Sequence, residues 1–252
     1  MSLSVSLGQY SVANEFVHIP GGEFRSVIPE GEDDNLVAVA DFLMQEAPVT
    51  NAEFMRFVLH HPEWQRSRAV SLFVDDQYLS TWAGSIYLGS ELGPQQPVTQ
   101  VSWFAAAAYC EWQDARLPSW YEWEYVAAAN DSMADARELP GWRQHILSWY
   151  SQAGGHRIGD VRSRPSNYYH IFDAHGLVWE WVDDFNSFLV SGDNREQGGA
   201  DELQFCGAGA ISMEEKENYA VLMRVAMLSA LEARYTTRNL GFRCARQGEI
   251  SQ

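Results

Sequence analysis

The stretch PVTQVSWFAAAAYCEW at residues 97–112, followed by RLPSWYEWEY at residues 116–125, decides the fold of this chain. Its first five residues predict a short strand, and Ser102 then caps a helix that runs to about Asp114. The Ser-x-x-Glu spacing that starts at Ser119 predicts a capping box, in which two residues satisfy backbone N–H groups at the start of a second helix. We therefore expect two short, capped helices after a short strand.

On both sides of this stretch the sequence predicts short strands, one more capped helix and much irregular backbone. Apolar runs and Gly or Pro residues between them mark these elements. The expected elements are strands at 18–24 (with a Gly-Gly turn), 36–43 and 240–246, a helix from Thr50 to Pro62, and irregular segments at 65–96 and 131–205. Residues 219–232 fit a helix or a buried strand equally well by periodicity. No linker divides the chain, so we expect a single domain over residues 1–252.

The composition is that of a soluble globular protein with a strongly acidic surface. The chain has 252 residues, of which 46% are apolar, and a formal net charge of -17. This charge argues against binding to DNA, RNA or an anionic membrane, because Lys and Arg must neutralise phosphates there. No apolar run of about 18 residues occurs, so no membrane span is expected. The N-terminus does not resemble a signal peptide, which predicts a cytoplasmic protein and leaves an exported mature form open.

Four segments, in order along the chain, resemble the formylglycine-generating-enzyme (sulfatase-modifying factor) family. They are IPGGEF (19–24), APVTNAEF (47–54), the stretch 97–125 quoted above, and FDAHGLVWEW (172–181) together with NLGFRCAR (239–246). Each segment is a weak signal alone, and their shared order over nearly the whole chain is a specific one. The resemblance implies an α+β, C-type-lectin-like fold with short helices, small antiparallel sheets and much irregular structure.

The three cysteines indicate which chemistry of that family this chain can keep. The resemblance implies a structural disulfide between Cys110 and Cys244, and in a reducing compartment the two would be buried thiols. The namesake enzyme oxidises a substrate cysteine with a copper ion held by two cysteines, and the matching positions here are Ser212 and Glu217. A hydroxyl and a carboxylate are poor ligands for Cu(I), so no copper is expected. Cys206 is either a buried apolar residue or a lone reactive thiol.

The resemblance also implies a structural calcium site. Its mapped ligands are the side chains of Asp173 and Glu180 and the backbone carbonyls of Gly176 and Val178. Carboxylate and carbonyl oxygens are the ligands that calcium prefers. Leu177 departs from the Asn that is usual in the family, although it is not a mapped ligand. In the alternative interpretation, Asp173 caps a turn and Glu180 accepts hydrogen bonds from backbone amides.

Two functions follow from these expectations. The first is a non-catalytic member of the family, a ligand- or protein-binding or regulatory module that binds a protein partner or a small organic ligand in its groove. The second is an oxidative or tailoring enzyme that uses residues other than cysteine pairs, and formylglycine generation itself is not expected. Candidate catalytic residues for the second function are Cys206, Ser212 and Arg224, with Tyr219 and Trp179 as further candidates in the groove region.

Overall fold

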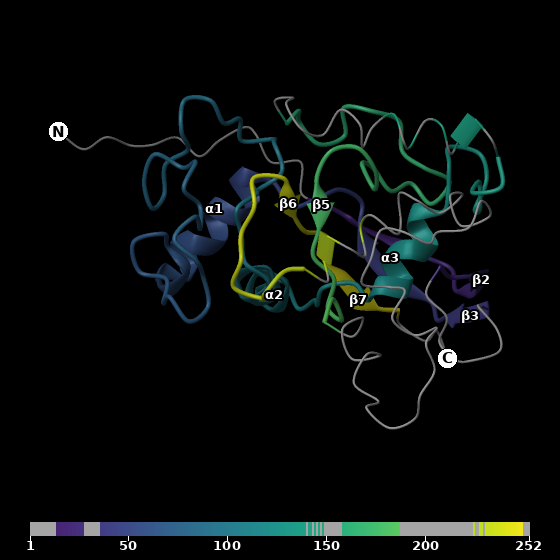
Figure 1. Cartoon of the computed structure of the whole chain (residues 1–252), viewed down its shortest axis with the longest axis horizontal. Coiled ribbons are helices and arrows are strands. Elements are labelled where there is room, and N and C mark those ends of the chain that lie inside the picture. The colour runs from purple at the N-terminus through teal and green to yellow at the C-terminus, as the bar shows by residue number, and fades with distance from the viewer. Residues whose placement is uncertain are drawn as a thin grey trace, which may run out of the picture.

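Short elements joined by long irregular segments make up the part of the chain that the computed structural model describes (Figure 1). The described residues are 14–27, 36–139, 141, 142, 144, 146, 148, 158–186, 224, 227, 228 and 230–248. The helices are α1 (Asn51–His60), α2 (Trp103–Trp112) and α3 (Trp120–Ala127), with a 3-10 helix η1 (Pro62–Trp64). The strands are β1 (Phe16–Ile19), β2 (Gly22–Arg25), β3 (Leu36–Val39), β4 (Phe42–Gln45), β5 (Trp179–Glu180), β6 (Leu240–Gly241) and β7 (Ala245–Gln247). The expected α+β class is confirmed.

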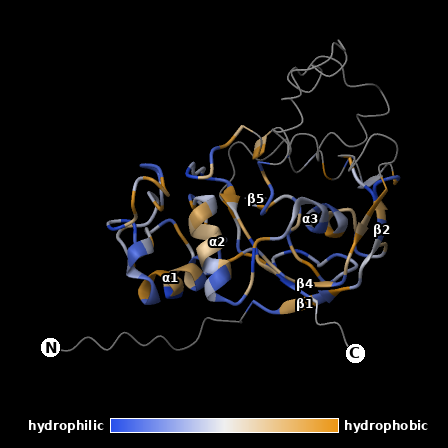
Figure 2. Cartoon of the chain, turned by 90° about the horizontal axis from the view of Figure 1, so that it is seen from below, coloured by the Kyte–Doolittle hydropathy of each residue, from blue (hydrophilic) through white to orange (hydrophobic). Residues whose placement is uncertain are grey.

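Strand β4 joins the beginning and the end of the described chain in one sheet. It pairs antiparallel with β1 on one side and with β7 on the other, so that Met44 lies opposite both Val17 and Ala245. Strands β2 and β3 form a separate antiparallel pair, and β5 and β6 form a short parallel pair. Figure 2 shows β1 and β4 side by side. The small sheets therefore hold together segments that are far apart in the sequence.

The structure divides two runs that the sequence predicted as single strands. Residues 36–43 are shared between β3 and β4, because Asp41 Oδ1 accepts the N–H of Gly21 at 2.7 Å and the chain changes sheet there. The approach is close, since a Cβ on Gly21 would lie 2.5 Å from the Val39 carbonyl oxygen. Residues 240–246 are likewise divided between β6 and β7.

Polar side chains predicted as caps begin α1, α2 and α3. Thr50 and Ser119 each complete a capping box with the glutamate three residues further on, and Ser102 accepts one backbone N–H of α2. These predictions are confirmed, although α2 and α3 end at Trp112 and Ala127, before their expected ends. No helix of the described residues is long and apolar enough to cross a membrane.

Tryptophan rings fill the core and donate hydrogen bonds inside it. Trp82, Trp120 and Trp181 are among the largest fully buried side chains. Trp82 Nε1 donates to Asn51 Oδ1 at 3.2 Å, and Trp181 Nε1 donates to the carbonyl of Val101 at 3.0 Å. A buried indole needs such a partner, and each ring covers a large area of irregular backbone. The hydropathy colouring of Figure 2 shows α2 as largely apolar, in keeping with its place in this core.

Candidate functional site

Cys110 and Cys244 form a disulfide that ties α2 to the segment between β6 and β7. Both residues are fully buried, and the bridge spans a sequence separation of 134. The chain contains three cysteines, so the bridge leaves Cys206 as the remaining thiol. A pair of thiolates therefore cannot be assembled within this chain while the bridge is intact. Cys206 lies outside the residues that the structure describes. The same holds for Ser212, Glu217 and Tyr219, which the sequence analysis also singled out.

Glu180, an acidic residue of the expected calcium set, pairs with a buried arginine. Arg243 Nε lies 2.8 Å from Glu180 Oε2, and Arg243 Nη2 lies 2.8 Å from Oε1. Both side chains are buried, with 1% and 0% of their surfaces exposed. Arg243 also donates to the carbonyls of Phe172, Gln45 and Glu46. The guanidinium thus joins β5 to β4, and neither sequence interpretation of Glu180 included this partner.

Asp173 begins a tight loop and keeps one carboxylate oxygen without a partner. The backbone is left-handed at Asp173 (φ 55°) and at Gly176 (φ 82°), a conformation that is uncommon for a residue other than glycine. Asp173 Oδ2 accepts the N–H of Arg162 at 2.7 Å, whereas Oδ1 is buried and has no hydrogen-bond partner. Burial raises the pKa of the Asp173 carboxyl, because the charged form loses its water. A buried carboxylate oxygen of this kind fits a bound cation or an ordered water.

Arg224, a candidate for catalysis from the sequence, lies in the core. It is 1% exposed, and its guanidinium carbon lies 3.5 Å from the centre of the Trp123 ring. Its Nη2 donates to the carbonyl of Glu180 at 2.6 Å. Nearby, His175 Nε2 lies 2.7 Å from the carbonyl of Ala127, and burial lowers the pKa of this histidine to about 4. Arg224 thus links β5 to α3, which gives it a packing role in the described part of the chain.

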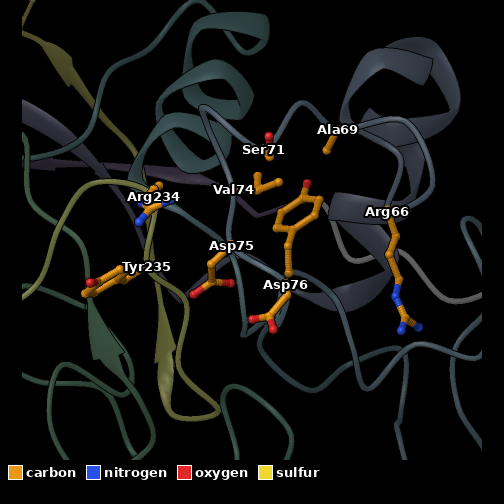
Figure 3. A pocket seen from close by; sticks show the side chains of 9 residues that line it. Arg66, Ala69, Ser71, Val74, Asp75, Asp76, Arg234 and Tyr235 are labelled. Atoms are coloured by element: carbon orange, nitrogen blue, oxygen red, sulfur yellow. The ribbon is translucent and has the colours of Figure 1, made fainter.

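A pocket of about 580 Å³ opens between the segment that follows η1 and the segment that precedes β6 (Figure 3). Asp75 lines one side of the pocket. Its two carboxylate oxygens accept the N–H and the hydroxyl of Thr236 at 2.9 and 2.7 Å, which joins the two segments. The pocket is lined by Arg66, Ala69, Ser71, Val74, Asp75, Asp76, Tyr78, Arg234 and Tyr235. None of them was predicted from the sequence. The sequence signal that could have indicated the pocket is the run AVSLFVDD at 69–76, in which mostly apolar residues are followed by two aspartates.

A family profile described as the sulfatase-modifying factor enzyme 1-like domain matches residues 6–248 of this chain. The chain belongs to this family. The match includes both cysteines of the disulfide, the Asp173 loop and the pocket, and the resemblance stated from the four sequence segments is confirmed.

Relatives of this sulfatase-modifying factor enzyme 1-like domain include proteins named as active and as inactive. A formylglycine-generating enzyme of Streptomyces coelicolor is 28% identical over 288 residues, which cover 93% of this chain and 90% of that protein. An inactive C-alpha-formylglycine-generating enzyme 2 of Mus musculus is 26% identical over 273 residues, which cover 91% of this chain and 84% of that protein. The solved structure of PvdO from Pseudomonas aeruginosa superposes on this chain with a TM-score of 0.50 and 18% identity. The superposition covers 92% of this chain and 94% of the PvdO chain. This last likeness shows the fold alone.

We propose that the sulfatase-modifying factor enzyme 1-like domain of this chain binds calcium beside Asp173. The orphaned Oδ1 supplies one oxygen ligand, and each Glu180 oxygen has a second lone pair besides the one used by Arg243. Among the described residues no group of three His, Cys, Asp or Glu side chains could hold a metal, so the ion would depend on the carbonyls of Gly176 and Val178 as well.

Calcium is expected to raise the Tm of this domain relative to EDTA, and the rise should disappear in Asp173→Ala. At a calcium concentration of about 100 times the Kd, binding to the folded state alone contributes about 2.7 kcal/mol. For a chain of this size such a gain raises the Tm by about 5–10 °C. Differential scanning fluorimetry measures it, with the exposed Asp131→Asn as the matched control. Equal Tm values of the wild type in calcium and in EDTA would contradict the site.

Proposed function

We propose that this chain is a non-catalytic member of its family that binds a ligand or a partner protein. The cysteine inventory carries the proposal, since the chain has three cysteines and a buried disulfide uses two of them. The copper chemistry of the namesake enzyme needs two thiolates, and Cys206 alone remains. The position of Arg224 in the core adds support, because this candidate catalytic residue is 1% exposed.

The surface beside the pocket has the character of a binding site. Val70, Leu72 and Phe73 expose 58%, 70% and 38% of their surfaces within the segment that also lines the pocket. Phe73 is held in place by an edge-to-face contact with Phe104, whose ring centre lies 5.2 Å away. Exposed apolar side chains next to a pocket favour ligand or protein binding. The net charge of -17 argues against nucleic acid or an anionic membrane as the partner.

Similarity to the mouse protein named inactive gives the proposal a second support. That relative covers 91% of this chain, so a protein named inactive spans the same domain. Binding modules and enzymes can share one fold, and the residues of the site decide between them.

A peptide that contains Cys-x-Pro-x-Arg is expected to stay unoxidised when incubated with this protein, Cu(I) and oxygen. The reason is that no second thiolate is available to hold the copper ion. Mass spectrometry of the peptide measures the conversion, and the Streptomyces coelicolor relative serves as the positive control. Metal analysis of the purified protein should also find no stoichiometric copper. Formylglycine in the peptide would refute the proposed function, and another stoichiometric redox metal would favour the oxidative or tailoring enzyme.

A further inference from the structure

The pocket beside residues 66–78 contains charges of both signs that do not pair with each other. Arg66 and Arg234 line it together with Asp75 and Asp76, and Figure 3 shows the two aspartates between the two arginines in that view. In the part of the chain that the structure describes, no ion pair joins either arginine to either aspartate. Arg66 Nη1 donates to the carbonyl of Trp82 at 2.8 Å, and Arg234 pairs with Glu232 at 3.2 Å.

The existing contacts leave a carboxylate and guanidinium donors available to a ligand. Asp75 is fully engaged, because it accepts hydrogen bonds from Thr236 and from the N–H of Gln77. Asp76 is exposed, and its carboxylate has no hydrogen bond or ion pair within the described residues. A guanidinium has five N–H donors, so Arg66 keeps most of its donors after one bond to a carbonyl.

Apart from Ser71, the remaining lining is apolar and aromatic. Val74 and Tyr78 form a buried base with 6% and 2% of their surfaces exposed, and the Tyr235 ring lies on the side of Arg234. The volume of about 580 Å³ is within the range of about 300–1,000 Å³ that is usual for small organic ligands. An apolar ligand body of modest size therefore fits between the charged groups.

Charges of both signs in one pocket favour a ligand that also carries both. A simple anion would approach against the field of a chain with a net charge of -17 and would meet Asp76. A simple cation would meet Arg66 and Arg234. A zwitterion avoids both costs, because each of its groups faces an opposite charge and its net charge is zero.

We propose that this pocket binds a small zwitterion with an apolar body, of the free amino-acid or short-peptide type. Its ammonium group pairs with Asp76 and its carboxylate with Arg66, while its apolar part lies over Val74. The proposal rests on the proposed binding function, since it names the ligand class of the same surface.

Isothermal titration calorimetry of the full chain with a panel of apolar dipeptides, led by leucylphenylalanine, tests the ligand class. At least one free dipeptide should bind, and its N-acetylated and C-amidated forms should each bind about tenfold more weakly, the effect of one lost charged hydrogen bond. Binding of the blocked forms as tight as that of the free form would overturn the proposal. The absence of binding by every dipeptide and free apolar amino acid in the panel would also overturn it.

Two substitutions locate the site. Asp76→Asn should weaken binding of the free dipeptide about tenfold and leave the weaker binding of the N-acetylated form unchanged. Arg66→Gln should also weaken binding of the free dipeptide about tenfold, and it should leave the weaker binding of the C-amidated form unchanged. Asp131→Asn and Arg68→Gln are the matched controls, since both residues are exposed and neither lines the pocket. Equal affinities of Asp76→Asn and Asp131→Asn would place the ligand elsewhere and overturn the assignment.

The two proposals fail separately in this experiment. Chemical change of the bound dipeptide, seen by mass spectrometry after the titration, would refute the non-catalytic function and leave the site in place. Loss of the preference for free over blocked dipeptides would refute the ligand class and leave the non-catalytic function standing.

Discussion

The double substitution Cys110→Ala and Cys244→Ala is expected to lower the free energy of unfolding by about 5 kcal/mol. The bridge spans a sequence separation of 134, and a cross-link over such a loop removes many conformations from the unfolded chain. Both cysteines are fully buried, so the alanine variant also loses some packing in the core. Denaturation by urea, followed by fluorescence of the ten tryptophans, measures the change.

Cys206→Ala is the matched control, because it removes the thiol that does not belong to the bridge. The wild type treated with reductant should approach the stability of the double variant. The usual cost of removing a native disulfide is well above about 1 kcal/mol. A loss of less than about 1 kcal/mol in the double variant would show that the bridge between α2 and the C-terminal segment does not stabilise the fold.

Arg243→Met is expected to cost about 3–5 kcal/mol of stability. The substitution introduces an unbranched apolar side chain, shorter than that of arginine, and leaves the buried Glu180 carboxylate without its bidentate partner. It also removes the donors to the carbonyl of Phe172 and to two carbonyls at the end of β4. Urea denaturation and the amount of soluble protein after expression measure the effect.

Two further variants separate charge burial from a general effect of losing an arginine. Adding Glu180→Leu to Arg243→Met should restore part of the stability, since no unpaired charge then remains buried. Arg68→Met removes an exposed arginine and should stay within about 0.5 kcal/mol of the wild type. If Arg243→Met behaved like Arg68→Met, the buried pair would have no stabilising role.

The helices could be predicted from the sequence because capping depends on residues within one turn. Thr50, Ser102 and Ser119 each stand just before a helix, and their partners lie three residues further on. The fold could be predicted because the family segments contain the residues that hold it. Trp181 and Phe242, both from the fourth segment, are fully buried in the same core.

Contacts between distant residues could not be predicted in this way. Glu180 and Arg243 are 63 residues apart, and Asp75, which lines the pocket, is 161 residues from its partner Thr236. Periodicity carries no information about such pairs, so the calcium interpretation of Glu180 did not include its guanidinium partner. The same limit applies to residues 36–43, where one tertiary hydrogen bond from Gly21 divides a run of strand-forming residues.

Counting free thiols tests most directly whether this chain can hold a copper centre of two thiolates, as the resemblance implies for the namesake enzyme. The protein is unfolded in guanidinium chloride without reductant, and its thiols are titrated with a chromogenic disulfide reagent. We predict one thiol per chain, from Cys206, and three after prior reduction. Three thiols without reductant would contradict the bridge and remove the main support for a non-catalytic function.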